Sequence, residues 1–296
     1  MLEYSLIILS TVLFGGQFIA LSAYQDKNGK SYRSIFLFCT LFSVLGAFIF
    51  LALNLFRLSF SWYTLLMASI AAFIQLILQV VGIKALALGR VEIYSLFNVA
   101  GGMSVAYIFG ITYFQEEIMV SHIIGLVLIL SALIVPIIFD RKNKEKSPII
   151  FWVLCFLVFI ANGMFGVTNK IHINSGNGVS IKEYMFYMYI ILSVMSLIGF
   201  MIANIVVKGK DTKLLFNGKA ILFALLYGFL NSVGMFLQYS FADKIPASIL
   251  FPLSNGGCIV FGLIIGCIYY RRKPKLPDII QLLVATLGMV FFIVSF

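Results

Sequence analysis

Residues Lys84–Gly102, KALALGRVEIYSLFNVAGG, contain the end of one long apolar segment, a short polar turn and the start of a second apolar segment that reaches a Gly-Gly pair. The same arrangement recurs at Tyr239–Gly257, YSFADKIPASILFPLSNGG. When the two stretches are aligned without gaps, only one alanine and the two glycines are identical. What recurs is the order of apolar and polar segments, and few individual residues are the same. This recurrence predicts a chain made of two equivalent halves.

The composition predicts an integral membrane protein. Of the 296 residues, 62% are hydrophobic and 11% are charged, whereas about half of a soluble domain is apolar. A spanning helix needs about 20 mostly apolar residues, because lipid offers the backbone no hydrogen-bond partner. We expect spans at Leu2–Tyr24, Ser34–Phe56, Trp62–Ala87, Glu92–Phe114, Val120–Phe139, Ile149–Lys170, Ile181–Val207, Gly218–Ala242, Pro246–Tyr270 and Leu276–Phe296.

A charged segment divides the expected spans into two groups of five. Residues 140–148, DRKNKEKSP, form the predicted linker between a first repeat, residues 1–139, and a second repeat, residues 149–296. Because five is odd, the second group must enter the membrane from the side opposite to the first. We therefore expect an all-α membrane protein with ten transmembrane helices arranged as two inverted-topology repeats, as in many secondary transporters.

Basic residues are distributed unequally between the two sides of the expected membrane domain. Most of them, including Arg141, Lys142, Arg271 and Arg272, fall on the side opposite to both termini. Loops rich in Lys and Arg usually lie on the cytoplasmic side of a membrane, which predicts that this side is cytoplasmic and that both termini are on the opposite side. The formal net charge of +10 is then explained by contact with anionic headgroups rather than with nucleic acid.

Polar side chains within the spans are the candidates for a solute pathway, because they are costly in lipid unless they face protein or water. Gln75 and Gln79 are four residues apart and share a helix face. Asn231 and Gln238 are seven apart, two helical turns, and do the same. The predicted substrate-binding residues are Gln17, Gln75, Gln79, Lys84, Tyr94, Asn98, Asn162, Asn169, Asn231, Gln238 and Asn255. The alternative is that these groups only join neighbouring helices by hydrogen bonds, at about 0.6–2 kcal/mol each.

Lys84 permits two interpretations. At the end of a span, its ammonium group can attract an anionic substrate or pair with Glu92 across the turn. It can also reach the membrane interface on its flexible stem without any role in binding.

Five residues are candidates for hinges or close helix packing. Glycine lets helices approach closely, and a proline inside a helix removes one hydrogen bond and favours a kink. These candidates are Gly101, Gly102, Pro252, Gly256 and Gly257.

The chain resembles the EamA-like branch of the drug/metabolite transporter superfamily. The resemblance lies in the ten short-looped spans, in ALALGRVEIYSL at residues 85–96, in Glu116 nine residues before Gly125, and in Pro252 within LFPLSNGG. It implies that the first, third, fourth, sixth, eighth and ninth spans line a central pocket, and that both termini are cytoplasmic, opposite to the charge distribution. The chain departs from the family pattern at Arg271-Arg272, where a second glutamate is frequent.

These patterns favour a carrier that moves a small polar solute by alternating access. An amide-rich pathway with little charge suits a neutral or zwitterionic substrate, such as an amino acid, a nucleobase or a sugar-like solute. No acidic residue lies deep in the expected pathway, and Glu92 at a span start is the nearest, so uniport or exchange is favoured over proton coupling. The alternatives are an anion exchanger that uses Lys84 and a non-transporting membrane scaffold.

The sequence does not favour an enzyme. The only two histidines, His122 and His172, belong to no HExxH motif, and no GxSxG motif occurs. The four cysteines lie inside apolar segments without CxxC spacing. We expect no cofactor, no metal site and no nucleic-acid partner. The expected partners are the solute and the lipid bilayer, in a multi-pass protein of the cell membrane whose oligomeric state stays open.

Overall fold

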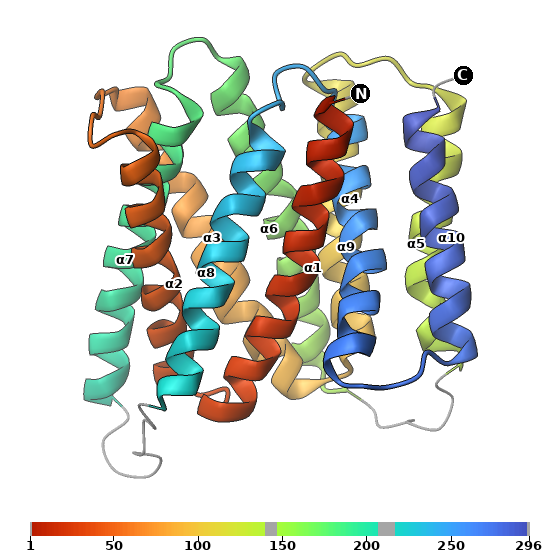
Figure 1. The fold of residues 1–296 in the computed structure, drawn as a ribbon, viewed down its shortest axis with the longest axis horizontal. Coiled ribbons are helices and arrows are strands. Elements are labelled where there is room, and N and C mark those ends of the chain that lie inside the picture. The colour runs from red at the N-terminus through yellow and green to blue at the C-terminus, as the bar shows by residue number, and fades with distance from the viewer. Residues whose placement is uncertain (1, 140–146, 207–216, 295–296) are drawn as a thin grey trace.

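Ten α-helices make up most of the chain (Figure 1). The computed structural model describes residues 2–139, 147–206 and 217–294, and these ranges contain no strand. The helices are α1 (Leu2–Asn28), α2 (Tyr32–Leu53), α3 (Trp62–Leu88), α4 (Val91–Thr112), α5 (Val120–Phe139), α6 (Ile149–Asn174), α7 (Ile181–Val206), α8 (Gly218–Tyr239), α9 (Ala247–Tyr269) and α10 (Leu276–Ile293). The ten expected spans are thus confirmed to within a few residues at each end. Most of the expected linker, residues 140–146, lies outside the described residues.

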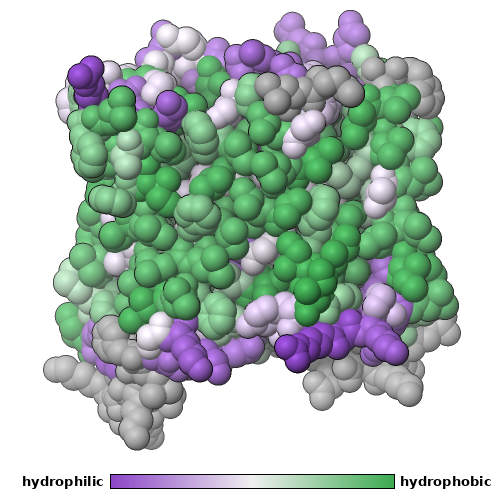
Figure 2. Space-filling view, in the orientation of Figure 1, coloured by the Kyte–Doolittle hydropathy of each residue, from purple (hydrophilic) through white to green (hydrophobic). Residues whose placement is uncertain are grey.

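The outer surface of the helices is apolar. Each of the ten helices is long and apolar enough to cross a membrane. Figure 2 shows a broad hydrophobic band between two hydrophilic rims, and large side chains such as Phe48 and Phe156 are 60% and 57% exposed. A surface of this kind is unfavourable in water and favourable in lipid. The chain is therefore a multi-pass membrane protein.

Polar groups at the helix ends bind backbone groups that the helices leave unpaired. The hydroxyl oxygens of Ser31 and Ser61 accept hydrogen bonds from the first turns of α2 and α3, as N-cap serines do. Arg33, which is buried, donates to the carbonyl oxygens of Ala203 and Asn204 near the end of α7. These contacts fix where the spans end.

The helices form an elongated bundle with two faces (Figure 1). The termini face carries the start of α1, the end of α10 and the α2–α3, α4–α5, α6–α7 and α8–α9 connections. The opposite face carries Lys30, Arg90 and Arg272, and we call it the basic face. Helices α2 and α7 pack together at one end of the bundle, and α5 and α10 pack together at the other.

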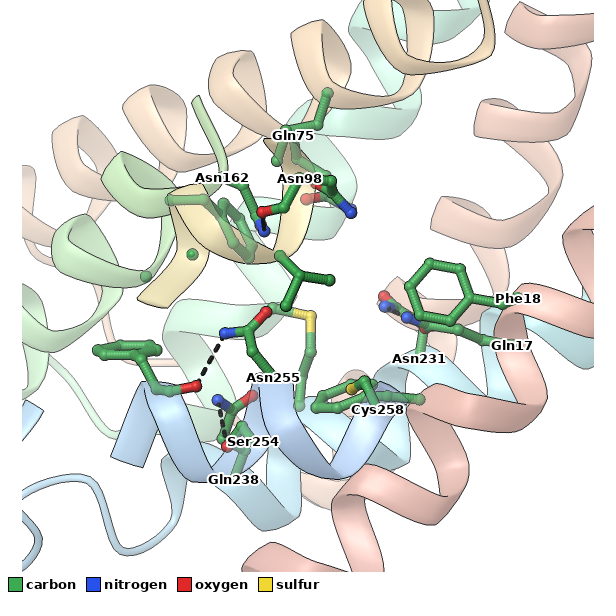
Figure 3. Close-up of a pocket in the computed structure, with 18 of the residues that line it drawn as sticks. Gln17, Phe18, Gln75, Asn98, Asn162, Asn231, Gln238, Ser254, Asn255 and Cys258 are labelled. Carbon is green, nitrogen blue, oxygen red and sulfur yellow. Dashed lines mark hydrogen bonds between the residues drawn. The ribbon is translucent and has the colours of Figure 1, made fainter. Parts of the chain in front are cut away.

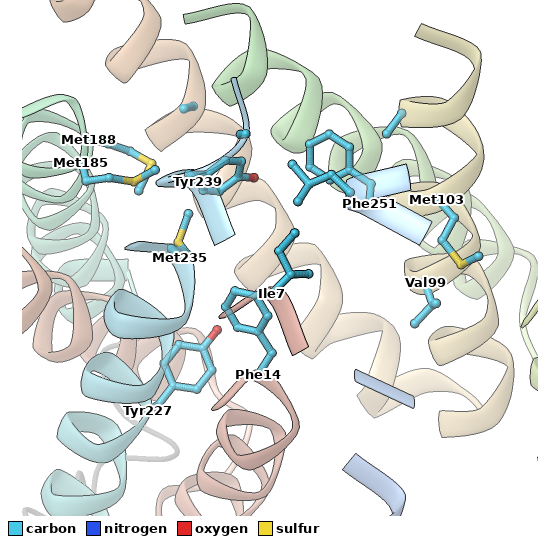
Figure 4. Close-up of a cluster of buried hydrophobic side chains, with 14 of the residues drawn as sticks. Ile7, Phe14, Val99, Met103, Met185, Met188, Tyr227, Met235, Tyr239 and Phe251 are labelled. Carbon is cyan, nitrogen blue, oxygen red and sulfur yellow. The ribbon is translucent and has the colours of Figure 1, made fainter. Parts of the chain in front are cut away.

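The six remaining helices surround the centre of the bundle. Helix α1 packs on α8 and α9, whereas α6 packs on α3 and α4, and α4 also contacts α9. Buried aromatic and methionine side chains from α1, α4, α7, α8 and α9 fill much of this region (Figure 4). Phe14, Tyr227 and Phe251 belong to this cluster and also form part of a central pocket. The pocket is therefore held by packed side chains.

Glycines bring the central helices into close contact. A Cβ atom added at Gly101 would collide with the backbone of Phe159 on α6, and one added at Gly257 would lie 2.5 Å from the Thr11 hydroxyl oxygen on α1. A Cβ at Gly256 would lie 2.8 Å from Ile129 on α5. These three glycines lie where neighbouring helices come into close contact, and their role in packing stays a prediction. The described helix α9 runs through Pro252 without a break, and a hinge at these positions stays a prediction.

Substitution of Gly101 tests this packing. Gly101→Ala is expected to force α4 and α6 apart and to lower the free energy of unfolding by about 1–3 kcal/mol, as overpacking does. The measurement is the thermal unfolding midpoint of the purified protein in detergent. The control is Gly218→Ala, because a Cβ atom there meets nothing within 4 Å. Equal midpoints for the two variants would contradict the close contact.

Candidate functional site

A cavity of about 170 Å³ lies at the centre of the bundle (Figure 3). Its walls come from α1, α3, α4, α6, α8 and α9, the six helices that the family resemblance implies. The wall residues lie within these helices, and only Tyr239 is at a helix end, that of α8, so the polar groups of the wall are mostly side chains. The cavity is thus a partly open space whose chemistry is set largely by side chains.

Nine of the eleven predicted substrate-binding residues line this cavity. They are Gln17, Gln75, Gln79, Tyr94, Asn98, Asn162, Asn231, Gln238 and Asn255. Figure 3 shows the labelled amide residues Gln17, Asn98, Asn162, Asn231 and Asn255 arranged around one space. The structure therefore brings these residues together, and their role in binding remains a prediction.

Asn169 does not line the cavity. It lies two helical turns beyond Asn162, but its side chain is completely buried. Its Oδ1 atom accepts a 2.6 Å hydrogen bond from the Tyr184 hydroxyl, and its Nδ2 atom donates to the Tyr239 hydroxyl at 3.1 Å. These partners belong to α7 and α8, so the helix face predicted from the spacing meets packed side chains at Asn169. Asn169 positions Tyr239, which does line the cavity.

Lys84 also lies outside the cavity. Its ammonium nitrogen lies 3.7 Å from the centre of the Tyr32 ring and 3.4 Å from the carbonyl oxygen of Lys30, to which it donates a hydrogen bond. Both partners belong to the α1–α2 region of the basic face. This position matches the interpretation of a lysine that reaches the interface, and it gives the proposed anion exchanger no support. The side chain of Glu92 lies outside the described part of the chain.

Several wall amides are held by neighbouring side chains. Asn231 donates through Nδ2 to Oε1 of Gln17 at 2.8 Å and accepts from the Tyr189 hydroxyl at 2.6 Å. Gln79 donates to the Tyr227 hydroxyl at 2.8 Å. Because these bonds fix which end of each amide faces the cavity, they give the wall a defined pattern of donors and acceptors.

Two asparagines meet at Gly102. Asn162 donates through Nδ2 to the carbonyl oxygen of Asn98 at 2.7 Å, and Asn255 donates to that of Phe251 at 2.8 Å. A Cβ atom at Gly102 would lie 2.7 Å from the Asn162 Nδ2 atom and 2.9 Å from the Asn255 Oδ1 atom. The missing side chain of Gly102 is therefore what leaves room for both amides.

Aromatic side chains of the wall were missed by the sequence interpretation. Phe14, Phe18, Phe165, Phe251, Tyr227 and Tyr239 all line the cavity. In a chain this hydrophobic, a lone aromatic residue is not distinguishable from core. Helical spacing provides a signal for some of them. Phe14 is three residues before Gln17 and four before Phe18, and Tyr227 is four residues before Asn231.

A buried ion pair closes the termini face. The Glu116 carboxylate accepts hydrogen bonds from the backbone N–H groups of Ala247 and Ser248 at 2.5 and 2.8 Å, at the start of α9. The Lys170 ammonium lies 3.7 Å from the Glu116 carboxylate and donates to the carbonyl oxygen of Ile245. We call this group the Glu116–Lys170 latch. It joins the end of α6, the α4–α5 connection and the α8–α9 turn.

The latch corrects the expectation for Lys170. The sequence places this residue at the end of a span and predicts an interfacial side chain, whereas the structure buries it to 2% exposure. The carboxylate partner and the carbonyl oxygen make that burial possible, because a buried charge needs compensation. In the sequence, only the family resemblance draws attention to Glu116. The contact of its carboxylate with the N-terminus of α9 is not predicted.

The exposure of the wall residues indicates which way the cavity opens. Toward the basic face, Phe18 is 40% exposed and Leu21, Tyr94 and Asn98 are partly exposed. Toward the termini face, Phe251 is 3% exposed, and Ser254 and Gln238 are also buried. The cavity is therefore closed beneath the latch and accessible from the direction of the basic face.

No family model matches the chain, and no curated protein matches it. Among solved structures, it resembles one described only as "Crystal structure of protein", with a TM-score of 0.76 and 13% sequence identity. The match covers 97% of this chain and 95% of that chain. At this identity the likeness concerns the fold alone.

The latch makes a specific prediction about stability. Glu116→Ala leaves Lys170 as a buried charge without its partner and frees two backbone N–H groups, so the free energy of unfolding is expected to fall by about 3–5 kcal/mol. The double variant Glu116→Gln with Lys170→Met is expected to recover part of this loss, because the glutamine oxygen still accepts a hydrogen bond and no charge is buried. Unfolding in detergent, followed by tryptophan fluorescence, measures both effects.

Glu117→Ala is the matched control, because Glu117 is the exposed neighbour of Glu116. It is expected to unfold like the unmodified protein. If Glu116→Ala were as stable as Glu117→Ala, the latch would not be a stabilising element.

Proposed function

We propose that the protein is a secondary transporter that moves a small, polar, uncharged metabolite across a membrane by alternating access. The observation that carries the proposal is the partly open cavity with many amide side chains in its wall, between the two faces of a multi-pass bundle. A polar cavity inside a membrane protein is unfavourable unless it holds water or a solute, and such cavities mark solute pathways. The family resemblance to EamA-like transporters has the same implication.

The pattern of helix contacts supports two inverted repeats, at residues 1–139 and 149–296. If α1 to α5 are exchanged with α6 to α10, the contact of α1 with α8 becomes that of α6 with α3, and both occur. The contact of α1 with α9 likewise becomes that of α6 with α4. The pairs α2 with α7, α4 with α9 and α5 with α10 are unchanged by the exchange. Such a pattern is expected of a pseudo-two-fold axis through the cavity.

Two turns provide independent support for the repeats. Gln115, before Glu116, and Arg271, before Arg272, both have a positive φ, of 54° and 51°, which is uncommon for residues other than glycine. The closing hydrogen bonds differ by one residue: Glu116 N–H donates to the carbonyl oxygen of Gly110, six residues earlier, and Arg272 N–H donates to that of Cys267, five residues earlier. The chain therefore leaves α4 and α9 in a similar conformation.

Alternating access requires one face to be closed while the other is open. The termini face is closed by the latch and by the hydrogen bond between Asn169 and Tyr239. At the other face, exposed hydrogen bonds join the α1–α2 connection to α3, from Lys30 to the carbonyl oxygen of Leu86 and from Lys84 to that of Lys30. On this mechanism, transport breaks the contacts that close the termini face and brings the helices of the basic face together around the substrate.

The composition of the wall supports uniport or exchange. Among the described residues, no acidic or basic side chain lines the cavity, and the Glu116 carboxylate is engaged with the start of α9. A proton-coupled carrier needs a titratable group whose protonation alternates with substrate binding. The described wall supplies no such group.

Reconstitution into liposomes tests the proposal. The purified protein is expected to take up a labelled solute in counterflow, and solute on the far side should accelerate the uptake, which a simple pore or a scaffold does not show. Labelled nucleobases, neutral sugars and amino acids are each tested in turn. Gly102→Val is expected to abolish the uptake, because its methyl groups would fill the space beside Asn162 and Asn255.

The control is Gly218→Val, since nothing lies within 4 Å of a Cβ atom at that position. Unchanged thermal unfolding of both variants verifies that they fold. Uptake by Gly102→Val at the rate of the control would contradict transport through this cavity.

Thiol labelling tests the direction of opening. In a background in which Cys39, Cys155, Cys258 and Cys267 are replaced by alanine, Phe18→Cys is expected to react faster with an impermeant maleimide supplied at the basic face. Phe251→Cys is expected to react slowly from the termini face, because the latch covers it. Asn177→Cys and Lys275→Cys, in exposed connections at the two faces, report where the reagent has access. Equal reactivity of Phe18→Cys from both faces would contradict a closed termini face.

A further inference from the structure

The wall of the cavity lacks the groups that a charged substrate needs. No Asp, Glu, Lys, Arg or His is among the described residues that line it. Among the described wall residues none begins a helix and only Tyr239 ends one, α8, so the wall provides no positive helix terminus for an anionic group. In membrane carriers, charged substrate groups are met by opposite charges or by such helix ends. A carboxylate, a phosphate or an ammonium group would therefore be desolvated here without compensation.

Unused amide groups provide donors and acceptors next to one another. The side chains of Gln75 and Asn98 make no hydrogen bond within the described part of the chain, and both face the cavity. On the neighbouring wall, the amide nitrogens of Asn162 and Asn255 are bound to backbone carbonyl groups, so their oxygens remain as acceptors. A primary amide can bind a ligand edge that carries one donor and one acceptor, as asparagine and glutamine do with adenine.

Aromatic rings complete the wall. Phe18 is 40% exposed, and the partly exposed rings of Tyr94 and Phe165 also line the cavity. Aromatic faces stack on planar heterocycles with a gain of about 1–3 kcal/mol per base. A ring that is flat and also has polar edges uses both features of the wall, whereas an aliphatic polyol uses only the hydrogen-bonding groups.

The volume of the cavity limits the size of the ligand. At about 170 Å³, it is smaller than the sites of about 300–1,000 Å³ that hold drug-sized ligands. It suits a single heterocycle better than a nucleoside, and a nucleotide is excluded by both its size and its charge.

We infer that the substrate is an uncharged, nucleobase-like heterocycle whose ring carries adjacent N–H and C=O or N groups. Its polar edge binds Asn98, Gln75 and the oxygens of Asn162 and Asn255, and its faces contact Phe18 and Phe165. This inference rests on the proposed function and names the substrate class of the same cavity.

Equilibrium binding with radiolabelled hypoxanthine and uracil tests the inference on the purified full-length protein. We expect saturable binding of at least one base, competed by other neutral bases and not by glucose, phenylalanine or uridine monophosphate. Asn98→Leu, which keeps the approximate size and removes the amide, is expected to weaken the binding about tenfold. Asn98→Asp is expected to weaken it further, because the charge is unfavourable in this wall.

Gln281→Leu is the matched control, since it makes the same kind of change on α10, which does not line the cavity. It is expected to bind as the unmodified protein does. Saturable binding of glucose or phenylalanine, or equal loss in Asn98→Leu and Gln281→Leu, would overturn the inference.

Counterflow separates this inference from the proposed function. Trans-stimulated uptake of a sugar or an amino acid, without base binding at millimolar concentrations, would overturn the substrate class and leave the carrier. Absence of counterflow with every labelled solute, in protein that binds a base, would instead overturn the carrier and leave the binding site.

Discussion

The backbone of a spanning segment must satisfy its hydrogen bonds within its own helix, and this constraint governs the rest of the structure. Of the six described helices around the cavity, only α8 ends in its wall, at Tyr239, so the backbone N–H groups of the wall are mostly bound within their own helices. Polarity in the centre has to come from side chains. Uncharged amides are side chains that provide donors and acceptors there without burying a charge, and they make up most of the polar side chains of the wall. The chemistry of the site thus follows from what lipid requires of the helices.

Tyrosine hydroxyls and glycines convert these amides into a defined site. Tyr189 fixes Asn231, which in turn orients Gln17. Gly102 leaves the space in which Asn162 and Asn255 meet. An amide that rotates freely can direct either its oxygen or its nitrogen into the cavity. When a neighbouring side chain binds one of these two atoms, the orientation of the amide is fixed. On the proposed function, selectivity would therefore depend also on residues outside the wall, including Tyr189 on α7.

The sequence predicts the ten helices well, because each apolar segment is long enough that its length alone identifies a span. It predicts most of the polar wall for a similar reason: amides such as Gln75 and Asn98 are rare in spans and need a polar surrounding. It fails where the partner is distant in sequence. Asn169 is an amide like the others, and only the Tyr184 and Tyr239 hydroxyls show that it belongs to packed protein. Lys170 has a basic side chain at a span end, and only Glu116 explains its burial.

The two faces of the bundle differ in the charged side chains that join their helices and connections. At the termini face, the turn after α4 places Glu116 on the start of α9. The turn after α9 also has a positive φ, but it carries Arg272, which pairs with Asp278 of its own segment at 2.7 Å instead. A buried carboxylate that joins three segments is harder to separate than an exposed pair within one segment, where screening is strong. On the proposed mechanism this difference biases the resting carrier toward opening at the basic face. Substrate binding must then supply enough free energy to separate Glu116 from the start of α9. The departure from repeat symmetry at Arg272 is therefore the feature that gives the two access states unequal stability.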